Sequence, residues 1–193
     1  MKKILLLILF AGIIVAVYYF ISFREENESR NIMPTVVPPD VAREQDYLNS
    51  LTDKEIQEEV FFTLSQYVIK PEFGGKVFCA DSIFGYDKTV SEKSISVYVW
   101  AYCEEYYLKG STVRLGAAVS KPVKVKYISV NQKLNYDSII VPNEGSGYKE
   151  SITEMFPKEF QDQAVAGIDN TTLIPSPKVQ ADNYYKGRLE VYF

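Results

Sequence analysis

Residues 4–23, near the N-terminus, form an apolar run without a single charged side chain. At about 1.5 Å of rise per residue, a helix over this run would cross roughly the 30 Å hydrocarbon core of a bilayer. The run therefore predicts a transmembrane helix with the lipid bilayer as its partner, and it leaves residues 24–193 to build a folded domain.

The flanks of this run bear on its fate and orientation. A cleaved signal needs small residues after a short apolar core, whereas this core continues into Tyr18, Tyr19 and Phe20, which are typical of a membrane interface. A retained anchor is favoured, and cleavage is the alternative. Because Lys2 and Lys3 precede the run, we expect a single-pass protein of the cell membrane, with a cytoplasmic N-terminus and an extracytoplasmic bulk.

The composition excludes several classes of chemistry. The chain has no histidine, which rules out Ser-His-Asp and Cys-His catalysis and Cys2His2 zinc sites. We expect neither a metal nor a cofactor. With 21 basic and 25 acidic residues and no basic run to neutralise phosphates, nucleic acid is not an expected partner.

Residue patterns divide the remainder into a proline-rich stalk over residues 24–39, an α+β domain over 40–167 and a loose tail over 168–193, with an edge strand at 184–193. A capping box from Thr52 to Glu55 predicts a helix that ends before Pro71. Its buried face is expected to carry Ile56, Val60, Phe61, Leu64 and Val68.

Strands are predicted over residues 76–86, 95–108, 112–128 and 136–141, and short helices over 148–155 and 158–166. Pro122 should mark a bulge, an edge or a change of strand partner, because proline cannot donate to the ladder. The fold class is therefore α+β, with a helix packed on a curved antiparallel sheet, cystatin-like or NTF2-like, and a short closing helix.

The two cysteines fit a hairpin register. If residues 87–93 close a hairpin in which Phe84 faces Tyr98, then Cys79 lies opposite Cys103. Opposed residues have Cα atoms about 4.5–5.5 Å apart, within the range of a disulfide. In an oxidising compartment a disulfide is favoured over two buried free thiols, and a catalytic thiol is disfavoured because no histidine could activate it.

The same register places Phe84, Tyr98, Trp100 and Tyr102 on the face of the hairpin opposite the cysteines. These four aromatic residues are candidates for a ligand-binding surface. Core packing beneath a covering helix is the alternative, and it is favoured.

Three carboxylates of this hairpin are candidates for acid chemistry. Asp81 is the exception on the apolar face that carries the cysteines, and we expect it to be a hydrogen-bonded structural acid. Glu104 is expected to be a solvated edge residue. Glu105 shares a face with Asp81 but lies about 13 Å from it along the strand, which is too far for a glycosidase pair.

Residues 146–149 match the S-x-x-K pattern, in which Lys149 could activate Ser146. Neither S-D-N nor K-T-G follows, so Ser146 is favoured as a helix cap. The catalytic pair Ser146 and Lys149 is the alternative.

Four segments between Val77 and Gln161 carry a resemblance: VFCADSIFGYD, ISVYVWAYCEEYYLKGS, VSKPVKVKY and GSGYKESITEMFPKEFQ. They resemble an uncharacterised bacterial extracytoplasmic domain family, similar to segments attached to some Gram-positive antirepressor-regulating membrane peptidases. The zinc motif of those peptidases is absent here, so the resemblance implies an accessory or sensory module without catalytic residues.

We therefore expect a membrane-anchored, noncatalytic extracytoplasmic binding module, with an envelope protein or a peptide as its partner. Two alternatives stay open. One is a hydrolase that uses Ser146 and Lys149 or carboxylates, and the other is a structural subunit of an envelope assembly.

Overall fold

A computed structural model describes residues 38–173 and 175–189. Its compact unit begins at Pro39, where the expected stalk ends. Among these described residues, no helix is long and apolar enough to cross a membrane. The predicted transmembrane run at residues 4–23 lies outside them.

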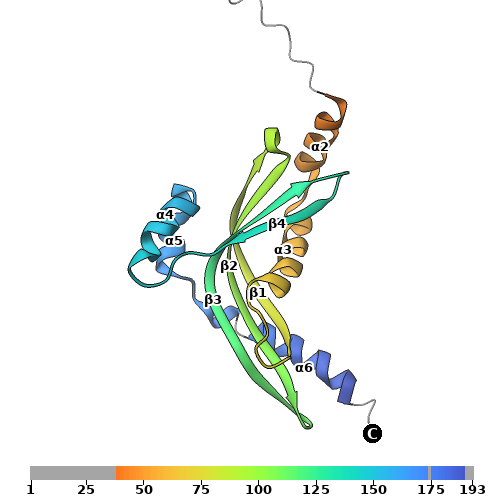
Figure 1. The fold of residues 1–193 in the computed structure, drawn as a ribbon, viewed down its shortest axis with the longest axis vertical. Coiled ribbons are helices and arrows are strands. Elements are labelled where there is room, and N and C mark those ends of the chain that lie inside the picture. Colours follow the sequence, from red (N-terminus) through yellow and green to blue (C-terminus); the bar gives the residue numbers. More distant parts are fainter. Residues whose placement is uncertain (1–37, 174, 190–193) are drawn as a thin grey trace, which may run out of the picture. The chain divides into compact units, whose positions relative to one another are not determined.

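The described chain is an α+β fold, as the sequence predicts (Figure 1). Four strands pair antiparallel in the order β1-β2-β3-β4 and form a curved sheet. The strands are β1 (Lys76–Thr89), β2 (Ser94–Lys109), β3 (Thr112–Ser129) and β4 (Leu134–Ile140). The helices are α2 (Pro39–Ser50), α3 (Asp53–Tyr67), α4 (Tyr148–Met155), α5 (Lys158–Ala166) and α6 (Pro175–Leu189). Short 3-10 turns lie at Val90–Glu92, Gly145–Gly147 and Asn170–Thr172.

The capping box sets the start of α3. The Glu55 amide donates to Thr52 Oγ1 at 3.3 Å, and the Thr52 amide donates back to Glu55 Oε2 at 2.8 Å. Phe61 was expected on the buried face of this helix, but it is 41% exposed, and Phe62 is 63% exposed. The expectation for Phe61 is wrong because the helix packs on the sheet through a narrower stripe, made of Ile56, Val60, Thr63 and Leu64.

The hairpin register confirms the disulfide. Cys79 lies opposite Cys103, with Cα atoms 4.1 Å apart, and their sulfur atoms are bonded. The expected pairing of Phe84 with Tyr98 is wrong, because a β-bulge at Phe84 puts Gly85 opposite Tyr98. A Cβ atom at Gly85 would lie 2.4 Å from Cζ of Phe160, so the bulge brings a glycine to the point where α5 approaches most closely.

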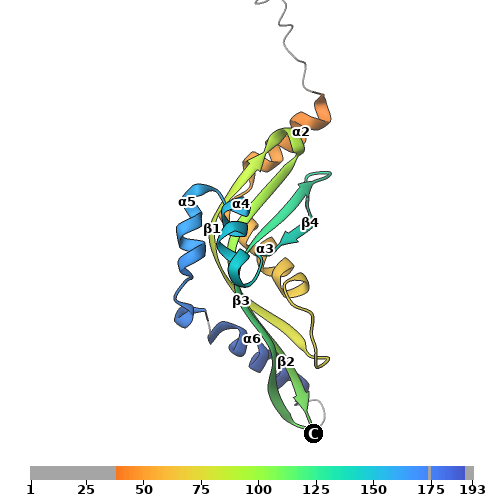
Figure 2. The same ribbon diagram turned by 60° about the vertical axis from the view of Figure 1, so that its left-hand side comes forward.

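Helices cover both faces of the sheet (Figures 1 and 2). On the face that carries the disulfide, α2 and α3 enclose the main core, in which Tyr127 donates a hydrogen bond to Thr63 at 3.0 Å. The opposite face is covered by α4 and α5 over Tyr98 and by α6 over Phe78 and Tyr106. The α+β arrangement is thus a sheet between two helical layers.

The segment expected to be a loose tail contains α6 instead, and residues 184–189 belong to this helix rather than to an edge strand. Buried residues recur every four positions along it, at Pro177, Ala181 and Tyr185. The hydroxyl of Tyr185 donates to the carbonyl oxygen of Tyr106 at 2.6 Å. These contacts with strands distant in the sequence stabilise α6, whose own residue pattern indicates a helix only weakly.

Pro122 lies where one side of β3 is an edge, which is one of the three expected possibilities. It is opposite Trp100 of β2, which pairs with β3 on both sides of this position, and the pairing of β3 with β4 begins only at Lys124.

Candidate functional site

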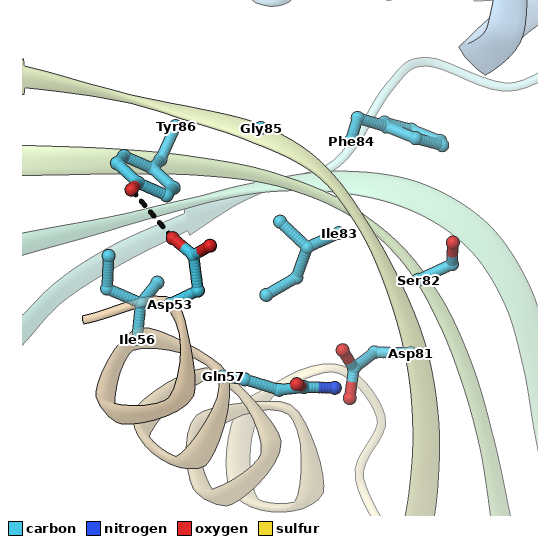
Figure 3. Close-up of a pocket in the computed structure, with 9 residues that line it drawn as sticks. All are labelled: Asp53, Ile56, Gln57, Asp81, Ser82, Ile83, Phe84, Gly85 and Tyr86. Carbon is cyan, nitrogen blue, oxygen red and sulfur yellow. Dashed lines mark hydrogen bonds between the residues drawn. The ribbon is translucent and has the colours of Figure 1, made fainter.

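A groove of about 490 Å³ lies between α3 and the edge strand β1 (Figure 3). We call it the α3–β1 groove. Its lining residues are Asp53, Ile56 and Gln57 from α3 and residues 81–86 from β1. The capping box fixes the first turn of α3, and the sheet fixes β1, so both walls belong to regular structure.

Asp81 is the distinctive group of this groove. Its Oδ2 atom is buried and has no hydrogen-bond partner in the described structure. Figure 3 shows the side chain of Gln57 extending toward it from α3, without a hydrogen bond between them. The sequence-based expectation of a hydrogen-bonded acid is therefore wrong for Oδ2. Burial raises the pKa of Asp81 to about 6, because the charged form loses solvation.

The second carboxylate of the groove is already paired. The hydroxyl of Tyr86 donates to Oδ1 of Asp53 at 2.8 Å (Figure 3). This hydrogen bond, together with partial burial, raises the pKa of Tyr86 above its ordinary value. No lysine or arginine lines the groove, so its two carboxylates have no cationic partner within it.

The backbone of β1 also contributes to the groove. Opposed residues with Cα atoms near 4.5 Å form non-hydrogen-bonded pairs, and their N–H and C=O groups point away from the neighbouring strand. The 4.1 Å separation puts Cys79 in this class, and every second residue of the regular ladder, Asp81 and Ile83, follows it. Consistent with this, the carbonyl oxygen of Cys79 accepts a hydrogen bond from Gln180 of α6 at 2.8 Å.

Exposed phenylalanines adjoin the groove. Phe61 and Phe62 line a second hollow of about 520 Å³, together with Lys54, Gln57, Glu58 and Asp81. Lys54 forms an i,i+4 ion pair with Glu58 at 3.7 Å on the exposed side of α3. Asp81 and Gln57 are shared by the two hollows, which places an apolar surface directly beside the unpaired carboxylate.

The candidate aromatic surface faces the C-terminal helices. Tyr98 is 4% exposed and lies 5.4 Å from Phe156 between ring centroids. Trp100 is also buried and donates Nε1–H to the Ser120 hydroxyl at 2.9 Å. Phe84 contacts Phe156 and also lines the α3–β1 groove. Their role in binding stays a prediction.

Tyr102, the fourth aromatic candidate, belongs to a buried polar cluster. Its hydroxyl donates to Oε1 of Glu104 at 2.5 Å, and Tyr106 donates to Oε2 at 2.6 Å. Burial, with the hydrogen bond to Glu104, raises the pKa of Tyr102 to about 12. The expectation that Glu104 is a solvated edge residue is wrong, because α6 packs beside it over the same face.

Glu105 acts as a structural carboxylate on the opposite face of β2. It is fully buried and accepts hydrogen bonds from the backbone amides of Glu72, Phe73, Gly75 and Ala117. Burial alone would raise the pKa of Glu105, but the four amide donors outweigh it and lower the pKa. Its oxygens are therefore occupied by the fold.

Ser146 and Lys149 are both exposed, and no hydrogen bond joins their side chains in the described structure. The expected cap is wrong, because Gly147 is the N-cap of α4 and Ser146 forms no side-chain cap bond. The hydroxyl of Ser151 instead accepts from the Asn143 amide at 2.9 Å and ties the loop to the helix.

Sequence reasoning missed the α3–β1 groove, although one signal was visible. Asp81 is a charge on an otherwise apolar strand face, which is unusual for a residue facing a core. The exposed position of Phe61 could not be inferred, because it depends on how α3 is rotated on the sheet. Among residues 38–173 and 175–189, no three potential metal ligands gather at one point.

No protein-family model, curated protein or solved structure matches this chain.

Proposed function

We propose that this chain is a membrane-anchored, noncatalytic extracytoplasmic binding module. It is held by residues 4–23 with its N-terminus in the cytoplasm, and its partner, an envelope protein or a peptide, binds in the α3–β1 groove. The observation that carries this proposal is the buried, unpaired Oδ2 of Asp81 at an open groove. Folded proteins rarely leave a buried acceptor without a partner, and a ligand that carries a hydrogen-bond donor would satisfy this one.

The chemistry of the groove favours binding over catalysis. Asp81 and Ser82 are adjacent on a strand and point to opposite faces, so they cannot act together as base and nucleophile. Asp53 is engaged by Tyr86. The remaining polar group, Gln57, is an amide suited to orienting a ligand.

The proposal extends to fold and kinship. A curved sheet that holds a helix on its concave side is the plan of cystatin-like and NTF2-like domains, and the packing of α3 on the sheet supports this relation. We also propose, from the resemblance of the four segments between Val77 and Gln161, kinship with the bacterial extracytoplasmic family named above.

Site-specific crosslinking tests the binding function. A photo-crosslinking residue is placed at Gln57 in the full chain in native membranes, and a matched one at Asp46, an exposed residue of α2. We expect a discrete crosslinked species at position 57 that disappears when Asp81→Asn is added. Equal crosslinking at both positions, unaffected by Asp81→Asn, would remove the groove as the binding site.

Protease accessibility tests the topology. Protease is added to cells whose wall or outer membrane has been opened while the cell membrane stays closed. It should remove a tag at the C-terminus of the full chain and leave a cytoplasmic marker intact. A tag that stays protected until the membrane is dissolved would contradict the proposed orientation.

A further inference from the structure

We propose that the ligand of the α3–β1 groove is an extended peptide segment that pairs with the outer edge of β1 and places a lysine or arginine side chain on Asp81. This inference rests on the binding function proposed above and specifies its ligand. It follows from three properties that meet at the groove: a free strand edge, an unpaired carboxylate and an adjoining apolar surface.

The free strand edge supplies main-chain hydrogen bonds. The N–H and C=O groups of Asp81 and Ile83 point away from β2, and in the described structure β1 pairs with no strand on that side. At Cys79 the edge is closed by the side chain of Gln180. The open stretch therefore begins at Asp81, inside the groove. An extended peptide satisfies such groups by strand addition.

The bulge at Phe84 limits the length of this pairing. Beyond it the register shifts by one residue, so the outward-pointing groups no longer follow the spacing of a regular strand. A ligand strand can therefore match Asp81 and Ile83 regularly, and a segment of about three to five residues is the expected footprint.

Charge selects the side chain. The groove holds two carboxylates and no basic group, and the acceptor without a partner is Oδ2 of Asp81, which is buried at the wall of the groove. An ammonium or guanidinium group supplies both hydrogen-bond donors and the opposite charge, and such charge-assisted bonds are stronger than neutral ones. An acidic side chain at this place would meet two carboxylates and be repelled.

The apolar surface suits the stem of that side chain and its neighbour. Phe61 and Phe62 flank Asp81 in the second hollow, and Phe61 is 41% exposed. The methylene stems of lysine and arginine pack well on such surfaces while the charged end reaches its partner. Since alternate residues of a strand share a face, an apolar residue two positions from the basic one would lie over the phenylalanines.

Peptide titration tests this proposal on the full chain in lipid nanodiscs. The probe is the blocked pentapeptide Val-Thr-Lys-Thr-Val, with a second peptide that has norleucine in place of the lysine, and calorimetry measures the binding of each peptide. We expect the lysine peptide to bind at least tenfold more tightly. The Asp81→Asn variant should remove this difference, whereas Asp46→Asn, at an exposed position of α2, should leave it unchanged.

Backbone methylation of the peptide tests strand pairing without altering the protein. Methyl groups on the amides that face β1 should abolish binding, and methyl groups on the alternate amides should not. If both methylated peptides bind equally, or if blocked lysine alone binds as tightly as the pentapeptide, strand addition is wrong. If the norleucine peptide binds as tightly as the lysine peptide, the basic side chain is wrong. In either case, crosslinking at position 57 would still report whether the groove binds a partner.

Discussion

At the scale of single residues, Asp81 weakens the fold whenever it is ionised. Its pKa in the folded chain is about 6, above the value of about 3.9 for an unfolded aspartate. The loss in unfolding free energy caused by ionised Asp81 is therefore absent below about pH 4 and complete above about pH 6. We expect Asp81→Asn to raise the free energy of unfolding by about 1–2 kcal/mol at pH 8 and by little at pH 4. Urea unfolding at both pH values measures this.

The matched control is Asp46→Asn, which changes an exposed aspartate and should leave stability unchanged at both pH values. An Asp81→Asn variant that is destabilised at pH 8 would contradict the assignment of an unpaired acid. A variant that gains stability but loses the lysine peptide would identify Asp81 as a binding residue, since functional sites commonly reduce stability.

Glu105 has the opposite effect on stability. Its pKa is lowered in the folded chain, so its contribution is present above the unfolded value of about 4.3 and is lost as the pH falls through the lowered folded value. Glu105→Gln offers an NH2 group to backbone donors, and we expect a loss of about 1–3 kcal/mol at pH 7. The exposed Glu154→Gln variant is the control for chemical denaturation. Equal stability of the two variants would contradict the role of the four amides.

At the scale of elements, the bulge in β1 and the docking of α5 depend on one contact. A methyl group at Gly85 would collide with the ring of Phe160. We expect Gly85→Ala to cost about 1–3 kcal/mol in unfolding free energy. In a Phe160→Leu background the same substitution should cost clearly less, which a double-mutant cycle measures. Additive losses would show that the glycine is needed for the bulge itself.

Local patterns predicted the elements they fully specify. The capping box sets the start of α3, and Pro157 sets the end of α4. Both signals act within a few residues of the helix end that they determine. By contrast, among residues 175–186 of α6, whose burial is described, only Pro177, Ala181 and Tyr185 are buried, and the partners of α6 on β1 and β2 are far away in sequence. The bulge could not be predicted for the same reason. The residue that Gly85 contacts is Phe160, which is distant from β1 in the sequence.

At the scale of the whole molecule, the sheet register ties the core to the disulfide. Replacing both cysteines with alanine should lower the free energy of unfolding by about 2–4 kcal/mol, given that they are 24 positions apart in the sequence. Because α3 and the β1 edge are held by the rest of the core, we expect the α3–β1 groove to keep its ligand affinity at 25 °C. Thermal unfolding and peptide titration of the double variant check both statements.

The candidate site shows the limit of reading a chain in one dimension. The position of Asp81 opposite Ala101, on the face of the cysteines, was predicted correctly from the register. The absence of a hydrogen-bond partner for Oδ2 of Asp81 was not predicted, because it depends on which turn of α3 packs over this residue. The sequence can show that a charged residue lies on a strand face. Whether its hydrogen-bond acceptor has a partner depends on how another element packs over it.

The bond from Gln180 to Cys79 joins residues 101 positions apart, while the disulfide joins residues only 24 apart. A chain growing from its N-terminus can therefore close the disulfide hairpin and the α3 core well before α6 exists. During that interval Phe78 and Tyr106 lie uncovered, and the edge of β1 is open at Cys79 as well as in the groove. The helix α6 thus sets how much of the β1 edge can pair with another strand. A nascent chain without α6 would expose a longer unpaired edge, which favours aggregation with other chains.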